Sequence, residues 1–434
     1  MTKPRLLLVH PAADKDRFGL RRRRRSSVPQ LNLPVLAAHA DDRFDVQIVD
    51  ENIEDIDLNI PADLVGISIM TPTALRGYEI ADAYRHRGTP VVIGGMHAFF
   101  MQEEAAMHAD TLVVGEAEYS WNRLLDDFLS GHTEKKYCSD EMHPLEGLPK
   151  PRLDLLKKDS YTFYNIMETA RGCPHHCHYC SVTQFWGNHF RFRPIPEVIE
   201  EMKSLPPGDI VFIDDNMFGH PNRAKELFEA MIPLKRHWYG QGDLRLAKDR
   251  ELLDLARRAG CRWIFVGLET TDPRNLRAMG KHSLNRGGDY GSAIAAIQKT
   301  GINLFASFIV GMDNDDKTVF NNILDFCITN RIGGANFYIL TPLPGTQLFK
   351  DMESAGRLLH KNWSRYDTNH VVFEPARMTQ TDLLEGYIRL YGKFYSLTSI
   401  ARRIITKGHD VPEMLALNIG RRINFRHFAA GCKV

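Results

Sequence analysis

The stretch ETARGCPHHCHYCSV, residues 168–182, holds three of the seven cysteines of the 434-residue chain. Cys173, Cys177 and Cys180 follow one another with the spacing C-x3-C-x2-C. Thiolates are soft ligands suited to iron–sulfur clusters or to zinc. Three cysteines leave one iron of a four-iron cluster without a protein ligand, and substrate chemistry at a cluster requires such an open site. The neighbouring histidines could instead complete a tetrahedral zinc site, so zinc is an alternative for this segment.

This cysteine stretch follows the first of six apolar segments that alternate with amphipathic helical patterns over residues 161–350. Such alternation predicts a partial or full barrel of the TIM type, (β/α)6, whose chemistry lies on the loops after the strands. The predicted strands are YNIMETA (164–170), DIVFIDD (209–215), HWYGQGD (237–243), RWIFVGLE (262–269), NLFASFIVG (303–311) and ANFYILTP (335–342).

Residues 1–130 alternate short apolar segments with helical patterns in the same way. This predicts an α/β domain with a doubly wound parallel sheet, which binds ligands at the carboxyl ends of its strands. A polar, proline-containing linker is expected at 131–160, and a mostly helical extension at 351–434. The predicted strands of the first domain are RLLLVHP (5–11), DVQIVDE (45–51), LVGISIM (64–70), PVVIGG (90–95) and TLVVGE (111–116).

The composition is that of an ordinary globular protein, with 43% hydrophobic and 25% charged residues and a net charge of +1. That charge gives no reason to expect a nucleic-acid partner. No apolar run approaches the roughly 18 residues that a membrane helix needs, so we expect a cytoplasmic protein without a transmembrane segment. The basic run Arg21–Arg25 could attract phosphates or an anionic membrane. A solvated loop is the expectation we favour for it.

The cysteine spacing after the first barrel strand resembles the radical S-adenosylmethionine (SAM) superfamily. The resemblance implies a [4Fe–4S] cluster on Cys173, Cys177 and Cys180, whose open iron is chelated by the amino and carboxylate groups of SAM. Electron transfer would then cleave SAM to a 5′-deoxyadenosyl radical, which implies an electron donor such as flavodoxin or ferredoxin. Tyr179 fills the position before the third cysteine at which the family typically has an aromatic residue.

The ends of the later strands also resemble this family. The resemblance places SAM-contacting groups there, although the usual Gly-Gly-Glu segment is absent and each residue taken singly could be ordinary strand-end polarity. LTPLPGT after the sixth strand resembles a phrase common in the cobalamin-linked members. The candidate residues are Asp214, Asp215 and Asn216 after the second strand, Gln241 and Asp243 after the third, Glu269 after the fourth, and Ser307 and Gly311 after the fifth.

The first domain resembles the cobalamin-binding domain of one large radical SAM subgroup, through SIMTPTALRGYEIAD (68–82), VVIGGMHAFF (91–100) and VVGEAEYSW (113–121). Glycines at strand ends would let the backbone approach a large flat ring closely. The Asp-x-His-x-x-Gly segment that gives cobalt a histidine ligand is absent, so we expect no histidine of this chain on the cobalt. Another ligand, or none, is the alternative for this domain. The implied cofactor-binding residues are Thr71, Thr73, Gly94, Gly95, His97, Gly115, Glu116 and Glu118.

Together these features predict a cobalamin-dependent radical SAM enzyme, in a methyltransferase or cyclase subgroup related to the hopanoid methylases. We expect it to methylate an unactivated carbon of a small-molecule or lipid-like substrate. One alternative is a cyclase or rearrangement enzyme that uses cobalamin without net methyl transfer. Another is a zinc-stabilised nucleic-acid-binding module. The identity of the substrate and the oligomeric state do not follow from the sequence.

Overall fold

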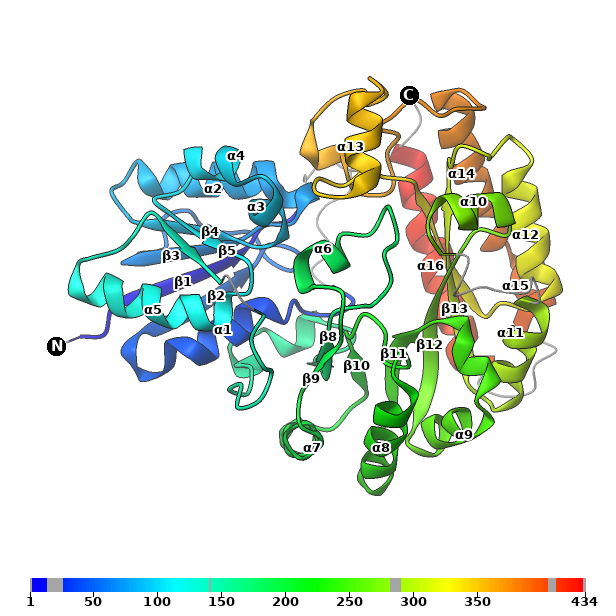
Figure 1. The fold of residues 1–434 in the computed structure, drawn as a ribbon, viewed down its shortest axis with the longest axis horizontal. Helices are drawn as coiled ribbons and strands as arrows, with labels where there is room; N and C mark the ends of the chain where they lie inside the picture. Colours follow the sequence, from blue (N-terminus) through cyan, green and yellow to red (C-terminus); the bar gives the residue numbers. More distant parts are fainter. Residues whose placement is uncertain (1, 14–25, 140–141, 282–289, 405–410, 432–434) are drawn as a thin grey trace. The chain divides into compact units, whose positions relative to one another are not determined.

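The computed structural model describes residues 2–13, 26–139, 142–281, 290–404 and 411–431. It divides into two compact units, the first drawn mainly in blue to cyan and the second in green to red (Figure 1). The first unit comprises Met1–Ile166, Gln184–Gly187 and Asn362–Asp367. The predicted basic run at Arg21–Arg25 lies outside the described residues. Within the described ranges, no helix combines the length and apolar character needed to cross a membrane.

The first unit contains a six-stranded parallel sheet in the order β2-β1-β3-β4-β5-β6. The doubly wound sheet predicted for this domain is confirmed, with one strand more than expected. That strand, Lys136–Cys138, lies in the segment predicted as a linker, and only its central Tyr137 is buried. The strands are β1 (Arg5–His10), β2 (Asp45–Asp50), β3 (Leu64–Ser68), β4 (Val91–Gly94), β5 (Thr111–Val114) and β6 (Lys136–Cys138).

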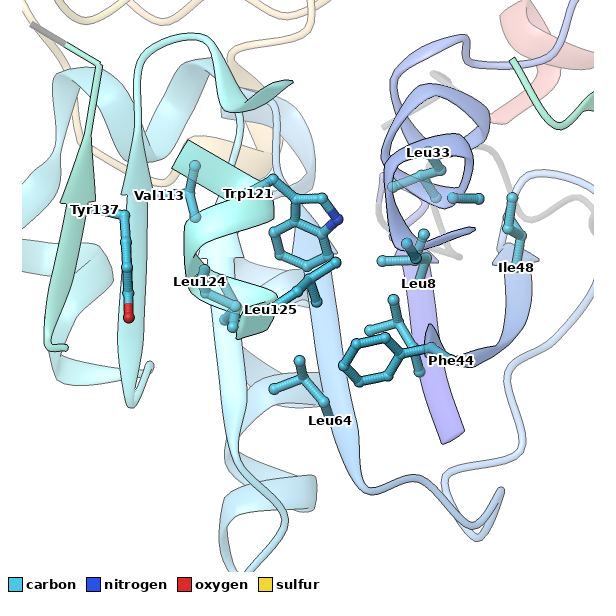
Figure 2. Packing of buried hydrophobic residues seen from close by; sticks show 14 residues of the cluster. Leu8, Leu33, Phe44, Ile48, Leu64, Val113, Trp121, Leu124, Leu125 and Tyr137 are labelled. Carbon is cyan, nitrogen blue, oxygen red and sulfur yellow. The ribbon is translucent and has the colours of Figure 1, made fainter. Parts of the chain in front are cut away.

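Helices cover this sheet and bury its apolar residues. Figure 2 shows the cluster in which Trp121 of one helix packs among Leu8, Leu64 and Phe44. Burying side chains of this size contributes about 1.5–3 kcal/mol each, so this cluster anchors the strands of the first sheet. The helices are α1 (Asn32–Ala40), α2 (Ala74–Arg85), α3 (Met96–Phe100), α4 (Gln102–Met107) and α5 (Ala117–Ser130).

The second unit contains a six-stranded sheet in the order β14-β13-β12-β11-β10-β7 and a small antiparallel pair, β8-β9. The strands from β10 to β14 pair in parallel, each with the next, which confirms the predicted barrel-type architecture. Its strands are β7 (Asn165–Met167), β8 (Ala170–Arg171), β9 (Arg191–Phe192), β10 (Ile210–Phe212), β11 (Trp238–Gly242), β12 (Cys261–Glu269), β13 (Asn303–Val310) and β14 (Gly334–Ile339).

The two faces of this sheet differ in burial. Ile264, Val266, Leu304 and Ala306 are fully buried, whereas Gln241, Phe265 and Phe305 on the opposite face keep partial exposure. Helix α6 (Val182–Trp186) is divided between the units, since its residues from Gln184 on belong to the first. The other helices of the second unit are α7 (Ile195–Ser204), α8 (Pro221–Met231), α9 (Arg250–Arg258), α10 (Pro273–Ala278), α11 (Tyr290–Lys299), α12 (Val319–Thr329), α13 (Gln347–Ser354), α14 (Gln380–Phe394), α15 (Leu397–Ile404) and α16 (Val411–Gly431).

The C-terminal region is helical as predicted, except that residues 355–379 contain only one short 3-10 turn, Trp363–Arg365. This turn belongs to the first unit, although the chain on both sides of it belongs to the second. The indole of Trp363 donates to the Glu104 carboxylate at 2.9 and 3.0 Å. It also packs edge-on against His97, with ring centroids 5.3 Å apart. A segment from the C-terminal third of the sequence is thus part of the N-terminal unit.

Candidate active site

The three cysteines lie on the loop between β8 and α6, where the sequence predicted them. Two backbone hydrogen bonds fix this loop at His178, between the second and third cysteines: its amide donates to the carbonyl of Met279 at 3.2 Å, and its carbonyl accepts from the amide of Leu348 at 3.0 Å. The Thr183 hydroxyl donates to the carbonyl of His175 at 2.8 Å. The loop is therefore positioned by the end of α10 and the start of α13, both of which follow barrel strands.

All three thiols are partly buried and free of disulfides. Burial raises the pKa of Cys173 to about 11 and that of Cys180 to about 12, and it raises the pKa of Cys177 as well. Deprotonated, the three would offer soft ligands without a fourth cysteine, a donor set that suits a cluster with one open iron. In the part of the chain that the structure describes, no three Cys, His, Asp or Glu side chains are gathered at metal-binding distance.

A buried polar cluster lies beside this loop, built around Glu269 at the end of β12. The carboxylate accepts from the ammonium of Lys281 at 2.7 Å and from the hydroxyl of Tyr179 at 3.1 Å. The hydroxyl of Ser307 on β13 donates to its other oxygen at 3.3 Å. Three residues predicted to contact the cofactor, Tyr179, Glu269 and Ser307, are thereby brought together.

Lys281, which is almost fully buried, was not among the residues predicted from the sequence. Burial opposes its charge, but the ion pair with Glu269 outweighs this and raises the pKa of Lys281. The cation also lies close enough to the thiols of Cys177 and Cys180 to interact with them electrostatically. Lys281 lies 12 residues after Glu269, beyond α10. The sequence around it contains no recognisable motif.

The backbone at this cluster is unusual. Glu269 has φ +63, a conformation that is rare outside glycine, and the β12–β13 register shifts between Gly267 and Glu269. A Cβ at Gly267 would lie 2.3 Å from the Glu269 carboxylate and 2.8 Å from the Lys281 ammonium. Left-handed backbone in a non-glycine residue typically costs about 1–3 kcal/mol and occurs preferentially at functional sites. The bulge thus aims the carboxylate at the cysteine loop.

The two aspartates after β10 have different surroundings. Asp214 accepts from the backbone amide of Thr169 at 2.7 Å and from its hydroxyl at 2.5 Å, so it ties β10 to the segment before the cysteine loop. Burial raises the pKa of Asp214 to about 7. Asp215 is less enclosed; burial raises its pKa to about 6, and it is close enough to Cys173 and Cys180 to interact with them. Of the two, Asp215 is the one next to the thiols.

After β11, Asp243 is held by neighbours. It accepts from Asn216 at 2.7 Å and from two nitrogens of Arg245 at 2.9 and 2.7 Å. Burial opposes ionisation, but these hydrogen bonds keep the pKa of Asp243 below its usual range. Arg245 also lies 3.0 Å from the imidazole of His175 in the cysteine loop. Gln241 stays half-buried on the partly exposed face of the sheet.

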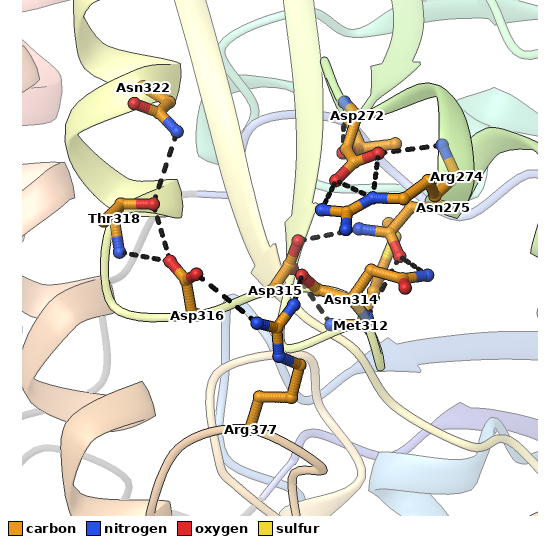
Figure 3. Close-up of polar contacts among 11 residues, drawn as sticks. Asp272, Arg274, Asn275, Met312, Asn314, Asp315, Asp316, Thr318, Asn322 and Arg377 are labelled. Carbon is orange, nitrogen blue, oxygen red and sulfur yellow. Dashed lines mark hydrogen bonds and ion pairs between the residues drawn. The ribbon is translucent and has the colours of Figure 1, made fainter.

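The loop after β13 begins at Gly311, and Figure 3 shows how it is held. Asp315 accepts from the backbone amides of Gly311 and Met312, each at 3.0 Å, and from the side chain of Asn275 at 2.7 Å. Asn275 belongs to α10, so Asp315 joins the loops after β12 and β13. Gly311 has φ +95, and a Cβ there would lie 2.8 Å from Leu383.

In the first unit, the predicted cofactor-binding residues gather at the carboxyl ends of β3, β4 and β5. Gly94 ends β4, and Gly95 (φ +97) follows it in contact with the loop after β3. Gly115 (φ +89) follows β5. A Cβ at Gly95 would lie 2.6 Å from the carbonyl oxygen of Ile69, so only glycine fits there. Thr71 and Thr73 are buried in the 3-10 turn after β3, and Glu116 and Glu118 are buried at the start of α5.

His97 is fully buried, and both of its ring nitrogens face protein atoms. Nδ1 lies 3.2 Å from the hydroxyl of Thr71, and Nε2 lies 3.5 Å from the Glu104 carboxylate. Burial lowers the pKa of His97. A ring so placed would have to leave these contacts to reach a cobalt ion. That no histidine of this chain ligates the cobalt stays a prediction. His97 instead joins the loop after β3 to α4.

Sequence comparison with known proteins agrees with this organisation. The Radical SAM superfamily model matches residues 167–327, and the B12 binding domain model matches residues 19–125. The chain is 31% identical to bacteriochlorophyllide d C-12(1)-methyltransferase of Chlorobaculum tepidum, over 86% of this chain and 84% of that protein. It is 29% identical to the C-8(2)-methyltransferase of the same organism, over 83% and 84%.

Among solved structures, the methyltransferase TsrM of Kitasatospora setae, with cobalamin and a [4Fe–4S] cluster bound, shares the fold with a TM-score of 0.69. The alignment covers 99% of both chains at 16% identity. These findings favour the iron–sulfur interpretation over the zinc-stabilised nucleic-acid-binding one. The chain belongs to the family of radical SAM enzymes that carry a B12-binding domain.

Proposed function

We propose that this chain transfers a methyl group to an unactivated carbon of a flat, conjugated small molecule of the chlorophyll-type tetrapyrrole class. The family supplies the cofactors, which are a [4Fe–4S] cluster, SAM and cobalamin. Bound together, they would supply a carbon radical able to remove hydrogen from an unactivated carbon, and a methyl group to replace it. The tetrapyrrole class comes from the two relatives above, which act on bacteriochlorophyllide d.

The observation that carries the proposal is the partly exposed face of the second sheet, which we call the inner face. It comprises the partly exposed Gln241, Phe265, Phe305, Asn336 and Tyr338 together with the buried Ser307, which lie on the side of the sheet to which Glu269 points. Phe265 and Phe305 are register partners whose rings stack 5.9 Å apart at 21°. Parallel, partly exposed aromatic rings favour a flat, conjugated ligand.

We assign the following roles to the residues of this chain. Cys173, Cys177 and Cys180 would hold the cluster, while Glu269, Lys281 and Asp215 would present both signs of charge to the zwitterionic end of SAM. The loops after β3, β4 and β5 would hold cobalamin, with Gly95 allowing the backbone to approach it. Flavodoxin or ferredoxin would supply electrons. We also infer that the protein works in the cytoplasm.

The test is turnover under anaerobic conditions. Holoenzyme reconstituted with iron, sulfide and cobalamin would be incubated with SAM, a chemical reductant and bacteriochlorophyllide d. The proposal expects a product heavier by one methylene unit, formed together with 5′-deoxyadenosine. The matched control is Cys177→Ala, which should form neither product. Production of 5′-deoxyadenosine without any change in the tetrapyrrole would refute the substrate class while leaving the radical chemistry in place.

A further inference from the structure

We infer that Arg421, on the C-terminal helix α16, binds a carboxylate of the methyl acceptor. The inference rests on the proposed function, since it places the acceptor on the inner face defined above. Its basis is a cation that the fold positions among aromatic and neutral polar groups of that face. No acidic side chain pairs with it in the described part of the chain.

Helix α16 runs along the inner face of the sheet, and Figure 1 shows it in red beside β13. Near its start, the carboxylate of Glu413 accepts from Tyr239 at 3.1 Å and from Trp263 at 2.7 Å. Two turns later, Arg421 lies over the ring of Phe305, with its guanidinium carbon 5.4 Å from the centroid. The helix therefore covers the part of the sheet around Tyr239 and Trp263. It places Arg421 further along the strands, next to Phe305 and Asn336.

The register of β13 and β14 shows how close Arg421 lies to the polar cluster around Glu269. Its Nη1 donates to the side-chain oxygen of Asn336 at 3.0 Å, and Asn336 is the strand partner of Ser307. Ser307 in turn donates to Glu269, the centre of the polar cluster beside the cysteine loop. Neighbouring strands lie about 4.8 Å apart. Arg421 is thus about two strands from Glu269, a separation that an acceptor the size of a tetrapyrrole can span.

The hydrogen-bonding of Arg421 is incomplete for a guanidinium, which has five N–H donors. One Nη1 bond goes to Asn336, and the hydroxyl of Tyr391 lies within hydrogen-bonding range. Both partners are neutral. The side chain is partly exposed, and within the described residues no further hydrogen bond uses its remaining donors. An arginine in this state suits a carboxylate, which accepts two parallel N–H bonds from the planar fork.

Arg403, a second arginine of the C-terminal region, has a purely structural role and serves as a comparison. Arg403 is fully buried, and it also has no acidic partner among the described residues. All of its nitrogens, however, donate to acceptors: the carbonyls of Ile332, Gly333 and Phe394 and the side chains of Ser399 and Asn418. Arg403 joins α15 to its surroundings and has no donor left for a ligand. Arg421 differs in keeping both exposure and donors.

The experiment compares ligands that differ only in charge. Binding of protoporphyrin IX, a dicarboxylic acid, and of its uncharged dimethyl ester would be measured by anaerobic equilibrium dialysis against holoenzyme. Wild type should bind the acid at least tenfold more tightly than the ester, as a charge-assisted carboxylate–arginine pair implies. Arg421→Gln should bind the acid as weakly as the ester. Arg422→Gln is the matched control, since Arg422 donates to a backbone carbonyl, that of Tyr395; it should behave as wild type.

The outcomes separate the two proposals. Equal binding of acid and ester by wild type, or unchanged binding by Arg421→Gln, would overturn the role of Arg421 and leave the tetrapyrrole class standing. If wild type binds neither porphyrin, the tetrapyrrole class fails, and the smaller pair 2-naphthoate and methyl 2-naphthoate then tests Arg421 alone. Preference for naphthoate that disappears in Arg421→Gln would support the carboxylate site. The absence of such a preference would overturn it. Unchanged iron and cobalt content in the variants verifies that they are folded.

Discussion

Replacing Lys281 with Met would test whether the Glu269–Lys281 pair is an essential part of the site. The two charged atoms are 2.7 Å apart, and their side chains are only 9% and 10% exposed. Removing the cation leaves a buried carboxylate with only hydroxyl donors, from Tyr179 and Ser307. Breaking a buried pair in this way typically costs about 3–5 kcal/mol, because the remaining charge has lost both water and its partner.

The double variant Glu269→Gln/Lys281→Met separates stability from function. Glutamine keeps the shape of Glu269 and can accept from the same hydroxyls, so the double variant should recover to within about 1 kcal/mol of wild type. It should nevertheless lose SAM binding, because neither charge remains to meet the two ends of the amino acid. Lys225→Met is the control for a solvated cluster, since its partners Glu251 and Asp249 are 70% and 31% exposed; that change should cost under about 1 kcal/mol.

The assay is urea unfolding of the apo proteins, followed by circular dichroism, with SAM binding measured separately on the reconstituted holoenzymes. Including Glu269→Gln alone completes a double-mutant cycle, for which we expect a coupling energy of about 3 kcal/mol. Purely additive effects would show that the two charges do not depend on each other, and the buried-pair argument would fail. A double variant that binds SAM as wild type does would refute the functional role of the pair.

Three further predictions concern other parts of the chain. Cys261→Ala and other changes at the buried cysteines outside the loop should leave the iron content unchanged, whereas Cys177→Ala should lose the cluster; iron loss in Cys261→Ala with the fold intact would contradict the assignment. Gly95→Ala should lose cobalamin on gel filtration, because its Cβ would lie 2.6 Å from a backbone oxygen. Gly88→Ala, equally left-handed at φ +76 but with nothing within 4 Å, should retain it. Burial raises the pKa of Asp315 to about 6. The folded state therefore holds that proton more tightly than the unfolded state, whose pKa is about 3.9, and this stabilisation is lost as the pH rises through 6. We would measure the unfolding free energy of wild type and of Asp315→Asn at pH 5 and at pH 7.5. Between these pH values wild type should lose about 1.4 kcal/mol relative to the variant, whatever the difference in stability at either pH. A difference between the two proteins that does not change with pH would show that the carboxyl does not titrate in this range.

Much of the architecture follows from periodicity, because buried parallel strands appear as continuous apolar runs separated by amphipathic helices. All the long strands were predicted on that basis. Lys136–Cys138 was missed because only Tyr137 is buried, which leaves no apolar run to recognise. The turn at Trp363–Arg365 joins the first unit through Trp363 and Glu104, which are 259 positions apart. No local pattern carries such a contact.

In the candidate site, too, local sequence patterns predicted some residues, whereas residues that depend on long-range contacts were missed. The cysteine spacing and the strand-end residues could be found because they occur at fixed places relative to predictable strands. Lys281 could not, since its role depends on α10 turning it back toward Glu269. Arg421 lies in the stretch 351–434, for which the sequence predicted only a mostly helical extension. Its placement depends on the path of α16 across the inner face, which only the folded chain shows.

The origin of the methyl group tests the central claim most directly. Holoenzyme would be supplied with SAM carrying a deuterated methyl group, a reductant and bacteriochlorophyllide d, and the tetrapyrrole would be analysed by mass spectrometry. The account predicts a product that carries one deuterated methyl group and whose formation requires added cobalamin. A product with an altered ring skeleton and no deuterium would contradict it and would establish the cyclase alternative in its place.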